Sequence, residues 1–248
     1  MIDNRNTIVL IPARMASTRL PGKPLADING LPMIVQCWKR AVEANIGQVL
    51  VAAAEVEIAD AVRAQGGDAI VTDPALPSGS DRIAQALALR DPRRRFEYVV
   101  NLQGDLPTID SLSIQRCLAG LTNEPADIST IAARIERDED VANPNIVKAI
   151  APLGDGREVA FARDFLRKVG PEHKAPFWHH IGVYAYKRAV LERFVSLPVS
   201  AREAERKLEQ MRAMDNGMRI VVVRVDTVPL GVDTPAELET ARRMLRKA

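Results

Sequence analysis

Cysteine, histidine and aromatic residues are scarce in this chain of 248 residues. There are two cysteines and three histidines, and Phe, Trp and Tyr together make up 4% of the sequence. Cys37 and Cys117 lie far apart, and two of the histidines are adjacent, so the ligand spacing of a zinc site is missing. A chain this long buries enough surface to fold without disulfides. We therefore expect both cysteines to be reduced core thiols, as in a cytoplasmic protein.

Long apolar runs and extended basic stretches are also missing. No apolar run approaches the roughly 20 residues that cross a bilayer, and the first six residues are mostly polar. We therefore expect no signal peptide and no membrane partner. With 34 basic and 32 acidic residues, the net charge is only +2. The short basic runs lack interleaved aromatic residues, so we predict no nucleic-acid partner.

Three well-known site motifs are absent as well. The sequence has no G-x-S-x-G nucleophile elbow, which counts against a Ser-His-Asp hydrolase. Neither the P-loop pattern nor G-x-G-x-x-G occurs near the first expected strand. An ordinary P-loop ATPase and a dinucleotide-dependent enzyme are therefore disfavoured.

The most informative segment is 8–23. It begins with an apolar, β-branched run that is typical of a buried strand. The loop that follows carries Arg14, Arg19 and Lys23, with two hydroxyl residues between the arginines. Three cations at the carboxyl end of a strand suit a polyanion such as a nucleoside triphosphate. Because proline and glycine limit how a loop bends, we expect the cations to be preorganised. The restraining residues are Pro12, Pro21, Gly22 and Pro24.

Strands and helices alternate in the first half of the chain. This order predicts an open parallel sheet covered by helices on both faces. A tight turn at Asn29-Gly30 precedes the first expected helix. The expected strands are Thr7–Ile11, Gln48–Ala53, Ala69–Thr72 and Tyr98–Leu102, and the expected helices are Met33–Ala44, Ile58–Gln65, Asp81–Arg90 and Ser111–Leu121.

The second half has a different order, which predicts an insertion with a mixed sheet. A hairpin turn is expected at Gly154-Asp155-Gly156. Because no repeat or long linker separates the halves, we predict one α/β domain over residues 1–248. The expected strands are Asp127–Ile135, Ile146–Ile150, His180–Tyr186 and Arg219–Val225, and the expected helices are Ala201–Asp215 and Pro235–Arg246.

Two carboxylates are candidates for a metal site near the cationic loop. Asp105 follows an expected strand, and ligands of open α/β sheets bind at the carboxyl ends of strands. Asp233 precedes Thr234 and Glu237, which have the spacing of a capping box. Thr234 would then cap the helix, which leaves Asp233 free to point elsewhere. Mg²⁺ takes one or two protein carboxylates together with phosphate oxygens, so it suits this pair.

The segment Ser78–Arg82 opens an expected helix. Ser78 and Asp81 have capping-box spacing, which is a sufficient structural explanation by itself. The functional interpretation adds that a helix N-terminus with Gly79 offers free N–H groups to a base or a phosphate.

A second polar cluster lies on the expected strand His180–Tyr186. Alternation puts His180 and Tyr184 on one face. Aromatic residues with this spacing are often core residues, but a His and a Tyr beside a small glycine also make a polar pocket for a sugar. The pair Glu209-Gln210 adds hydrogen-bonding groups, although a charged helix is usually a solvated face.

Five motifs, in order and with matching spacing, resemble the 3-deoxy-manno-octulosonate cytidylyltransferase family. The likeness spans nearly the whole chain. The first motif alone is less specific, because spore-coat-type and sialic-acid cytidylyltransferases carry similar loops. The motifs are Ile11–Leu25, Ser78–Arg82, Val100–Asp105, His180–Tyr186 and Leu208–Arg212, and Val232–Pro235 closes the series.

The resemblance implies a nucleotide-diphospho-sugar transferase-like three-layer fold with a mixed, mostly parallel sheet. It also implies a homodimer and Mg²⁺. The implied reaction joins CTP and 3-deoxy-D-manno-octulosonate (Kdo) to give CMP-Kdo and pyrophosphate, which activates the sugar for lipopolysaccharide synthesis. A nucleotide-binding half would span about 1–122, and a sugar-binding and dimerisation half about 123–248.

The resemblance further implies roles for single residues. Arg14, Arg19 and Lys23 would hold the triphosphate, and Asp105 would join Arg14 and Lys23 as a catalytic residue. The remaining nucleotide residues would be Ala13, Ser78, Gly79, Arg82 and Gln103, the metal ligands Asp105 and Asp233, and the sugar residues Arg163, His180, Tyr184, Glu209 and Gln210.

The chain departs from the family pattern in three places. Ala52–Glu55 stands where the family usually has Asp residues, Ala160–Leu166 lacks a flanking aromatic and a proline, and Leu106 stands where many relatives have Glu. Three alternatives stay open. They are a cytidylyltransferase for another acidic sugar, such as 8-amino-Kdo or a sialic acid; a nucleotidyltransferase for another base; and a non-catalytic nucleotide-binding module.

Overall fold

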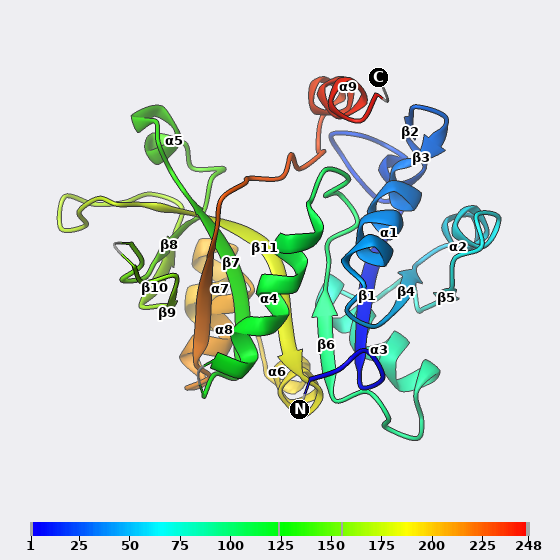
Figure 1. Ribbon diagram of the computed structural model, residues 1–248, viewed down its shortest axis with the longest axis horizontal. Helices are drawn as coiled ribbons and strands as arrows, with labels where there is room; N and C mark the ends of the chain where they lie inside the picture. The colour runs from blue at the N-terminus through cyan, green and yellow to red at the C-terminus, as the bar shows by residue number, and fades with distance from the viewer. Residues whose placement is uncertain (1, 124, 155, 247–248) are drawn as a thin grey trace. The chain divides into compact units, whose positions relative to one another are not determined.

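Residue contacts divide the chain into two units. The computed structural model describes residues 2–123, 125–154 and 156–246. The first unit comprises residues 1–115 and 229–248, and the second comprises residues 116–228. The C-terminal segment therefore belongs with the N-terminal strands (Figure 1). A single domain with a nucleotide-binding half and a sugar-binding half stays a prediction.

A parallel sheet forms the centre of the first unit. Its strands follow the order β5 (Ala69–Val71), β4 (Gln48–Ala53), β1 (Thr7–Ala13) and β6 (Tyr98–Asn101), and each neighbouring pair is parallel. β1 is a central strand, paired on both sides, and it is buried along its whole length. Parallel strands end at the same edge of a sheet, so the loops after β1, β4 and β6 leave the sheet together.

Short elements and helices complete the first unit. A 3₁₀ turn, η1 (Lys23–Leu25), is followed by a hairpin of β2 (Asp27–Ile28) and β3 (Leu31–Pro32). Asn29 and Gly30 form its turn with positive φ, as predicted. The helices are α1 (Met33–Ala44), α2 (Val56–Arg63), α3 (Gly79–Arg90), the first half of α4 (Ser111–Asn123) and α9 (Pro235–Met244).

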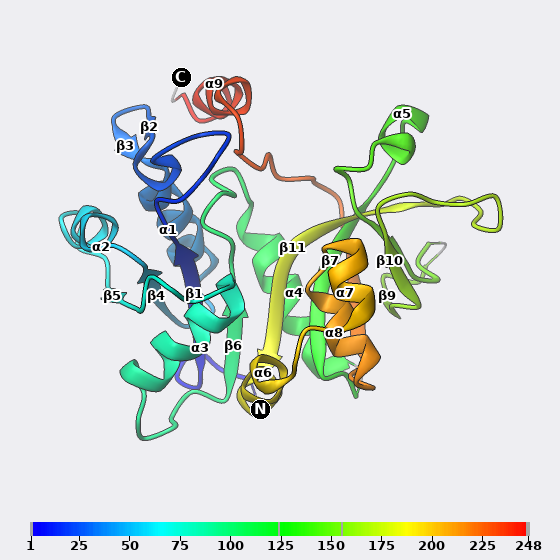
Figure 2. The same cartoon turned by 180° about the vertical axis from the view of Figure 1, so that it is seen from behind.

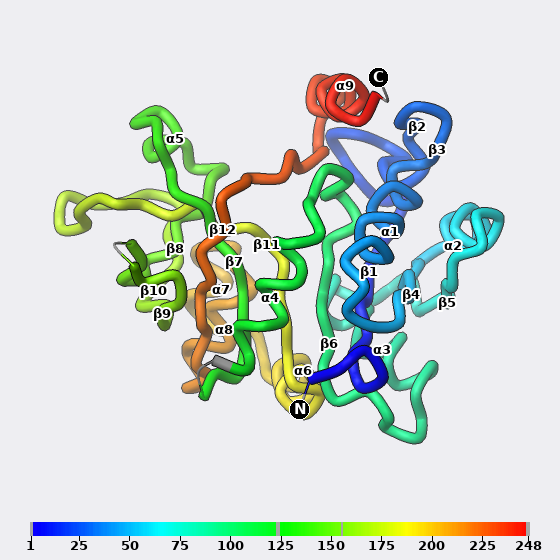
Figure 3. The backbone as a smooth tube through the Cα atoms, in the orientation of Figure 1, coloured from blue at the N-terminus to red at the C-terminus, as the bar shows by residue number. Residues whose placement is uncertain are grey.

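Helix α9 anchors the C-terminal segment to the first unit. It lies beside the β2–β3 hairpin in Figure 1 and in the tube of Figure 3. Leu238 and Ala241 pack against Ile28, Met33 and Cys37 in one buried cluster. This packing fixes the segment that precedes α9.

A mixed sheet forms the centre of the second unit. β7 (Ile128–Arg134) pairs antiparallel with β11 (Trp178–Lys187) and parallel with β12 (Ile220–Val225), and β9 (Val159–Phe161) is antiparallel to β12. β8 (Lys148–Ile150) pairs with β11 and with β10 (Asp164–Leu166). The last turns of α4 lie on one face of β7 and β12, and α7 and α8 lie on the other (Figures 1 and 2). The helices are α5 (Asp138–Ala142), α6 (Arg188–Ser196), α7 (Ala201–Arg206) and α8 (Gln210–Asp215).

The predicted α/β class with a mixed sheet is confirmed. The single helix predicted over Ala201–Asp215 is wrong, because Lys207 adopts a left-handed φ of 53° and ends α7. The break lets the apolar Leu208 turn into the core, where it is 5% exposed. The predicted turn at Gly154-Asp155-Gly156 contains Asp155, which lies outside the described residues.

Both cysteines are buried and unpaired, as predicted. Burial raises the pKa of the Cys37 and Cys117 thiols, which makes them poor nucleophiles. Among the helices of the described residues, none is long and apolar enough to cross a bilayer.

The contact between α4 and its sheet predicts an unusual response to Gly120→Ala. A Cβ at this position would overlap Ser129 Oγ and lie 2.7 Å from Val223 Cγ2. Alanine in place of glycine usually stabilises a helix, but here we expect a loss of about 1–3 kcal/mol from overpacking, measured by urea unfolding. Adding Ser129→Ala should restore part of the loss. A more stable Gly120→Ala protein would contradict this packing.

Candidate functional site

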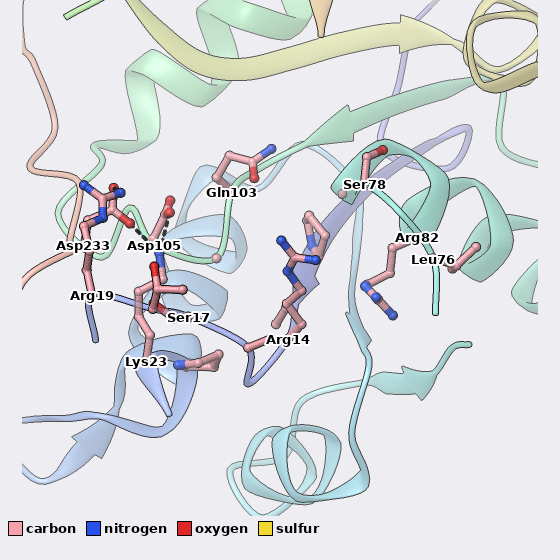
Figure 4. A pocket seen from close by; sticks show the side chains of 17 residues that line it. Arg14, Ser17, Arg19, Lys23, Leu76, Ser78, Arg82, Gln103, Asp105 and Asp233 are labelled. Atoms are coloured by element: carbon pink, nitrogen blue, oxygen red, sulfur yellow. Dashed lines mark hydrogen bonds and ion pairs between the residues drawn. The ribbon is translucent and has the colours of Figure 1, made fainter. Parts of the chain in front are cut away.

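The loops at the carboxyl edge of the first unit's sheet enclose a cavity of about 730 Å³. Its walls come from the loops after β1 and β6, the start of α3 and the segment before α9. In Figure 4, Asp105 and Asp233 lie at one end of this cavity and Ser78 and Arg82 at the other, with Arg14 between them. The structure brings together every residue predicted for nucleotide or metal: Ala13, Arg14, Arg19, Lys23, Ser78, Gly79, Arg82, Gln103, Asp105 and Asp233.

The loop from Arg14 to Lys23 is restrained at both ends. Met15 N donates a hydrogen bond to Glu55 Oε2 at 3.0 Å. Gly22, just before η1, has a φ of 67°, in the left-handed region that favours glycine. The first constraint fixes the direction in which the loop leaves β1, and the second fixes the backbone just before Lys23.

Lys23 joins the two carboxylates. Its Nζ lies 2.8 Å from Asp105 Oδ2 and 2.9 Å from Asp233 Oδ1. Arg19 Nη2 lies 2.8 Å from Asp233 Oδ2. Burial lowers the pKa of Lys23, but the two carboxylates outweigh burial, and the pKa lies above its usual value. Lys23 is therefore charged at neutral pH, although only 16% of its side chain is exposed.

Backbone hydrogen bonds place the two aspartates side by side. Val232 N donates to Asp105 O at 2.9 Å, which joins the segment before α9 to the loop after β6. Thr234 caps α9 in a capping box with Glu237, as predicted. The carboxylate of Asp233 is thus left to contact Lys23.

Arg82 is a buried cation in the same cavity. Its Nη1 donates to Thr72 Oγ1 at 2.6 Å and to Asp73 O at 3.0 Å. Its Nη2 is buried and has no hydrogen-bond partner among the described residues. Burial lowers the pKa of Arg82. Because buried N–H groups are rarely left unpaired, this nitrogen is available to an acceptor on a ligand.

Ser78 has the predicted capping role. It is the N-cap of α3, where its Oγ accepts from Asp81 N at 3.2 Å and donates to Asp81 Oδ2 at 2.6 Å. Gly79, the first helical residue, lines the cavity together with Gln103. The structural and functional interpretations of this segment are therefore compatible.

In the second unit, His180 and Tyr184 lie on either side of a β-bulge in β11. The register with β7 shifts between Ile181 and Tyr184. Thr130 Oγ1 donates to Val183 O at 2.8 Å and lies 3.1 Å from His180 Nε2. The rings of His180 and Tyr184 are 5.4 Å apart, so the two side chains meet as their spacing predicted.

Burial favours the neutral form of both side chains. It lowers the pKa of His180 to about 3, so the imidazole is neutral near pH 7. It raises the pKa of Tyr184 well above its usual value, and the charge of nearby Glu209 adds to the shift. Both side chains can therefore offer hydrogen bonds but not charge.

Glu209 and Gln210 lie at the start of α8. The Gln210 side chain is buried, and its Nε2 has no hydrogen-bond partner among the described residues. Arg212 makes a two-point contact with Glu203: Nε to Oε2 at 2.8 Å and Nη2 to Oε1 at 2.7 Å. This buried pair fixes the corner between α7 and α8 that presents Glu209 and Gln210.

Arg163 lies two residues before Phe165, whose ring is 5.0 Å from that of His180. It is exposed and lines a second cavity of about 300 Å³ with Glu172, His173 and Lys174. The other four predicted sugar residues do not line this cavity. The resemblance grouped all five residues. The structure shows the rings of His180 and Tyr184 near each other and the charge of Glu209 close enough to shift the pKa of Tyr184.

Glu55 and Arg212 make structural contacts in these regions that the sequence analysis did not predict. Glu55 was noted only as part of a departure from the family pattern, and its contact with Met15 spans 40 positions. Arg212 closes one of the motifs, but its partner Glu203 lies beyond the unpredicted break at Lys207. In both cases the contact depends on tertiary structure.

Comparison with known proteins identifies close relatives. A protein-family model described as "Cytidylyltransferase" matches residues 8–220. The "3-deoxy-manno-octulosonate cytidylyltransferase" of Parvibaculum lavamentivorans is 58% identical over 240 residues, which cover 97% of this chain and 93% of that protein. The protein of the same name from Rhodospirillum rubrum is 57% identical, with 96% and 95% covered.

Solved structures are similar as well. The structure of CMP:2-keto-3-deoxy-manno-octonic acid synthetase complexed with CTP has a TM-score of 0.86 and 36% sequence identity, and the match covers 96% of this chain and 98% of that chain. 4-Diphosphocytidyl-2C-methyl-D-erythritol synthase from Anaerococcus prevotii has a TM-score of 0.64 and 12% identity over 99% of this chain, so it shares the fold alone. Because relatives more than 50% identical match nearly the whole length, this chain belongs to the 3-deoxy-manno-octulosonate cytidylyltransferase family.

Proposed function

We propose that this protein transfers CMP from CTP to the anomeric hydroxyl of Kdo, giving CMP-Kdo and pyrophosphate. The observation that carries the proposal is the cavity of the first unit, where basic side chains and two carboxylates gather at the carboxyl edge of a parallel sheet. A structure that is 36% identical contains CTP. The names of the relatives favour Kdo over 8-amino-Kdo or a sialic acid.

Arg14 and Arg82 are the cations best placed to meet the triphosphate first. Arg14 is exposed and takes part in no ion pair within the described part of the chain. Arg82 has a buried N–H without a partner among the described residues. Lys23 and Arg19 are instead paired with carboxylates. Phosphate oxygens compete for these two cations, so both would exchange partners as the nucleotide binds.

Asp105 and Asp233 fit Mg²⁺ when the nucleotide is present. Their oxygens already converge on a positive group, Lys23 Nζ, at 2.8 and 2.9 Å. Among the described residues, no group of three or more His, Cys, Asp or Glu side chains is placed to hold a metal. Beyond these two carboxylates, the ligands of Mg²⁺ would therefore be phosphate oxygens and water. Bound Mg²⁺ would lower the pKa of the sugar hydroxyl and stabilise charge on the α-phosphate.

The reaction is an in-line substitution at the α-phosphorus. The anomeric oxygen forms a bond to this phosphorus, and the bond to the oxygen that bridges the α- and β-phosphates breaks. Pyrophosphate leaves with the electron pair, and the hydroxyl proton passes to solvent. Arg14 and Lys23 would neutralise the charge that develops on pyrophosphate.

The sugar would be bound by groups of the second unit. His180 and Gln210, which are buried, and Tyr184, which is half-buried, offer neutral hydrogen-bonding groups, and Glu209 offers a carboxylate near Tyr184. Arg163, in a cavity with a lysine and a histidine, suits the carboxylate of an acidic sugar. A homodimer in the cytoplasm stays a prediction of the family resemblance.

Release of pyrophosphate tests the proposed function. With CTP, Kdo and Mg²⁺, we expect pyrophosphate and CMP-Kdo in equal amounts, and neither product when Mg²⁺ is removed with a chelator. Other nucleotides and other acidic sugars serve as comparison substrates. Binding of CTP without any pyrophosphate release would instead support the non-catalytic alternative.

Removal of the Lys23 charge should slow the reaction. A charged hydrogen bond contributes roughly 1.5–3 kcal/mol, so Lys23→Met should lower kcat by about one to two decades. Lys39→Met, on α1 outside the cavity, is the matched control. Steady-state pyrophosphate release checks both variants. The role of Lys23 is refuted if its variant turns over like the control.

The buried neutral state of His180 predicts a pH effect on stability. The pKa is about 3 in the folded chain and 6.5 in a model peptide. As pH falls through this window, the unfolded chain takes up a proton that the folded chain does not, so stability falls, by up to about 1.4 kcal/mol per pH unit. Urea unfolding between pH 7 and 4.5 should show a steeper loss for the natural protein than for His180→Asn. Equal slopes would contradict a buried neutral imidazole.

A further inference from the structure

A side chain continues the hydrogen-bond ladder where β1 and β4 separate. The strands pair as far as Ala13 and Ala53, and Ala54 N donates to Ala13 O at 2.9 Å. The next N–H that faces β4 is that of Met15, and it donates to Glu55 Oε2 at 3.0 Å. The carboxylate of Glu55 thus takes the place of a backbone carbonyl at the point where the two chains diverge.

Glu55 makes this contact instead of capping its own helix. It is the N-cap residue of α2, where short polar side chains usually accept from the first N–H groups of the helix. The Glu55 side chain makes no such bond. It instead reaches a residue 40 positions earlier in the chain.

The contact acts on the cation that begins the loop. Arg14 lies between Ala13 and Met15, and both neighbours are tied to the chain after β4. The charges of Glu55 and Arg14 act in opposite directions on the pKa of Arg82, so both charges lie near its guanidinium. Glu55 itself does not line the cavity, whereas Arg14 and Arg82 do.

We propose that Glu55 is a positioning residue for the triphosphate loop: by holding the Met15 N–H, it sets the direction in which Arg14 enters the cavity. This inference rests on the proposed function, because it assumes that the cavity binds CTP. The acceptor is charged, and such hydrogen bonds are roughly twice as strong as neutral ones.

Substitutions at Glu55 separate the hydrogen bond from the charge. Glutamine keeps an oxygen at the same distance from the backbone but removes the charge. Aspartate keeps the charge but is one methylene too short to reach Met15 N. Glu57→Ala, an exposed position in the first turn of α2, is the matched control for loss of a carboxylate.

Calorimetric titration with CTP in the presence of Mg²⁺ and without Kdo is the test. We expect the Kd for CTP to rise about tenfold in Glu55→Ala and Glu55→Asp. Glu55→Gln should stay within about threefold of the natural protein, and Glu57→Ala should be unchanged. In the Arg14→Ala background, Glu55→Ala should add less than about twofold, because residues that act through each other are not additive.

Three results would overturn the inference. The first is a Kd for CTP in Glu55→Ala equal to that of the natural protein. The second is an equal rise in Kd in Glu55→Gln and Glu55→Ala. The third is a double variant with Arg14→Ala in which the two losses of CTP affinity are fully additive. Failure of the natural protein to bind CTP would be a different result, since it would refute the proposed function itself. Thermal unfolding midpoints verify that each variant is folded, and Glu55→Gln is the variant that disturbs the fold least.

Discussion

The site of the first unit depends on one ammonium group held between two carboxylates. Lys23 Nζ lies within 2.9 Å of both Asp105 and Asp233, and these three residues come from distant parts of the sequence. The parallel pairing of β1 with β6 brings residues 23 and 105 to one edge, and the packing of α9 returns residue 233 to it. The contact therefore depends on β1, β6 and α9 together.

The ion pairs also explain why the site can hold opposite charges without a ligand. Lys23 and Arg19 balance Asp105 and Asp233, whereas Arg14 takes part in no ion pair within the described residues. A triphosphate therefore meets a neutralised network at one end of the cavity and the cations Arg14 and Arg82 beyond it. In the second unit, by contrast, His180 and Tyr184 are uncharged, because burial disfavours the charged form of each side chain.

Local sequence rules predicted the structural placement of several of these residues. The capping box of Thr234 and Glu237 correctly predicted that Asp233 is free of capping. The positions of Asp105 and Ser78 followed from the ends of an expected strand and the start of an expected helix. The loop that carries Arg14, Arg19 and Lys23 was recognisable because proline and glycine residues lie between its charged residues.

Other features could not be predicted, because they depend on contacts between distant residues. A periodic charged pattern predicted one helix over Ala201–Asp215, but the burial of Leu208 and the left-handed Lys207 divide it. The role of Glu55 requires that β1 and β4 be neighbours. Arg163 was grouped with His180 by resemblance alone, and only the fold shows the cavity that it lines with Glu172, His173 and Lys174.

A crystal structure of this protein with CTP and Mg²⁺ tests the central claim most directly. The claim is that nucleotide binding makes Lys23 exchange its carboxylate partners for phosphate oxygens. We predict that Lys23 Nζ leaves its present contacts at 2.8 and 2.9 Å and lies within hydrogen-bond distance of the triphosphate. Bound CTP with Lys23 still between Asp105 and Asp233 would contradict the account.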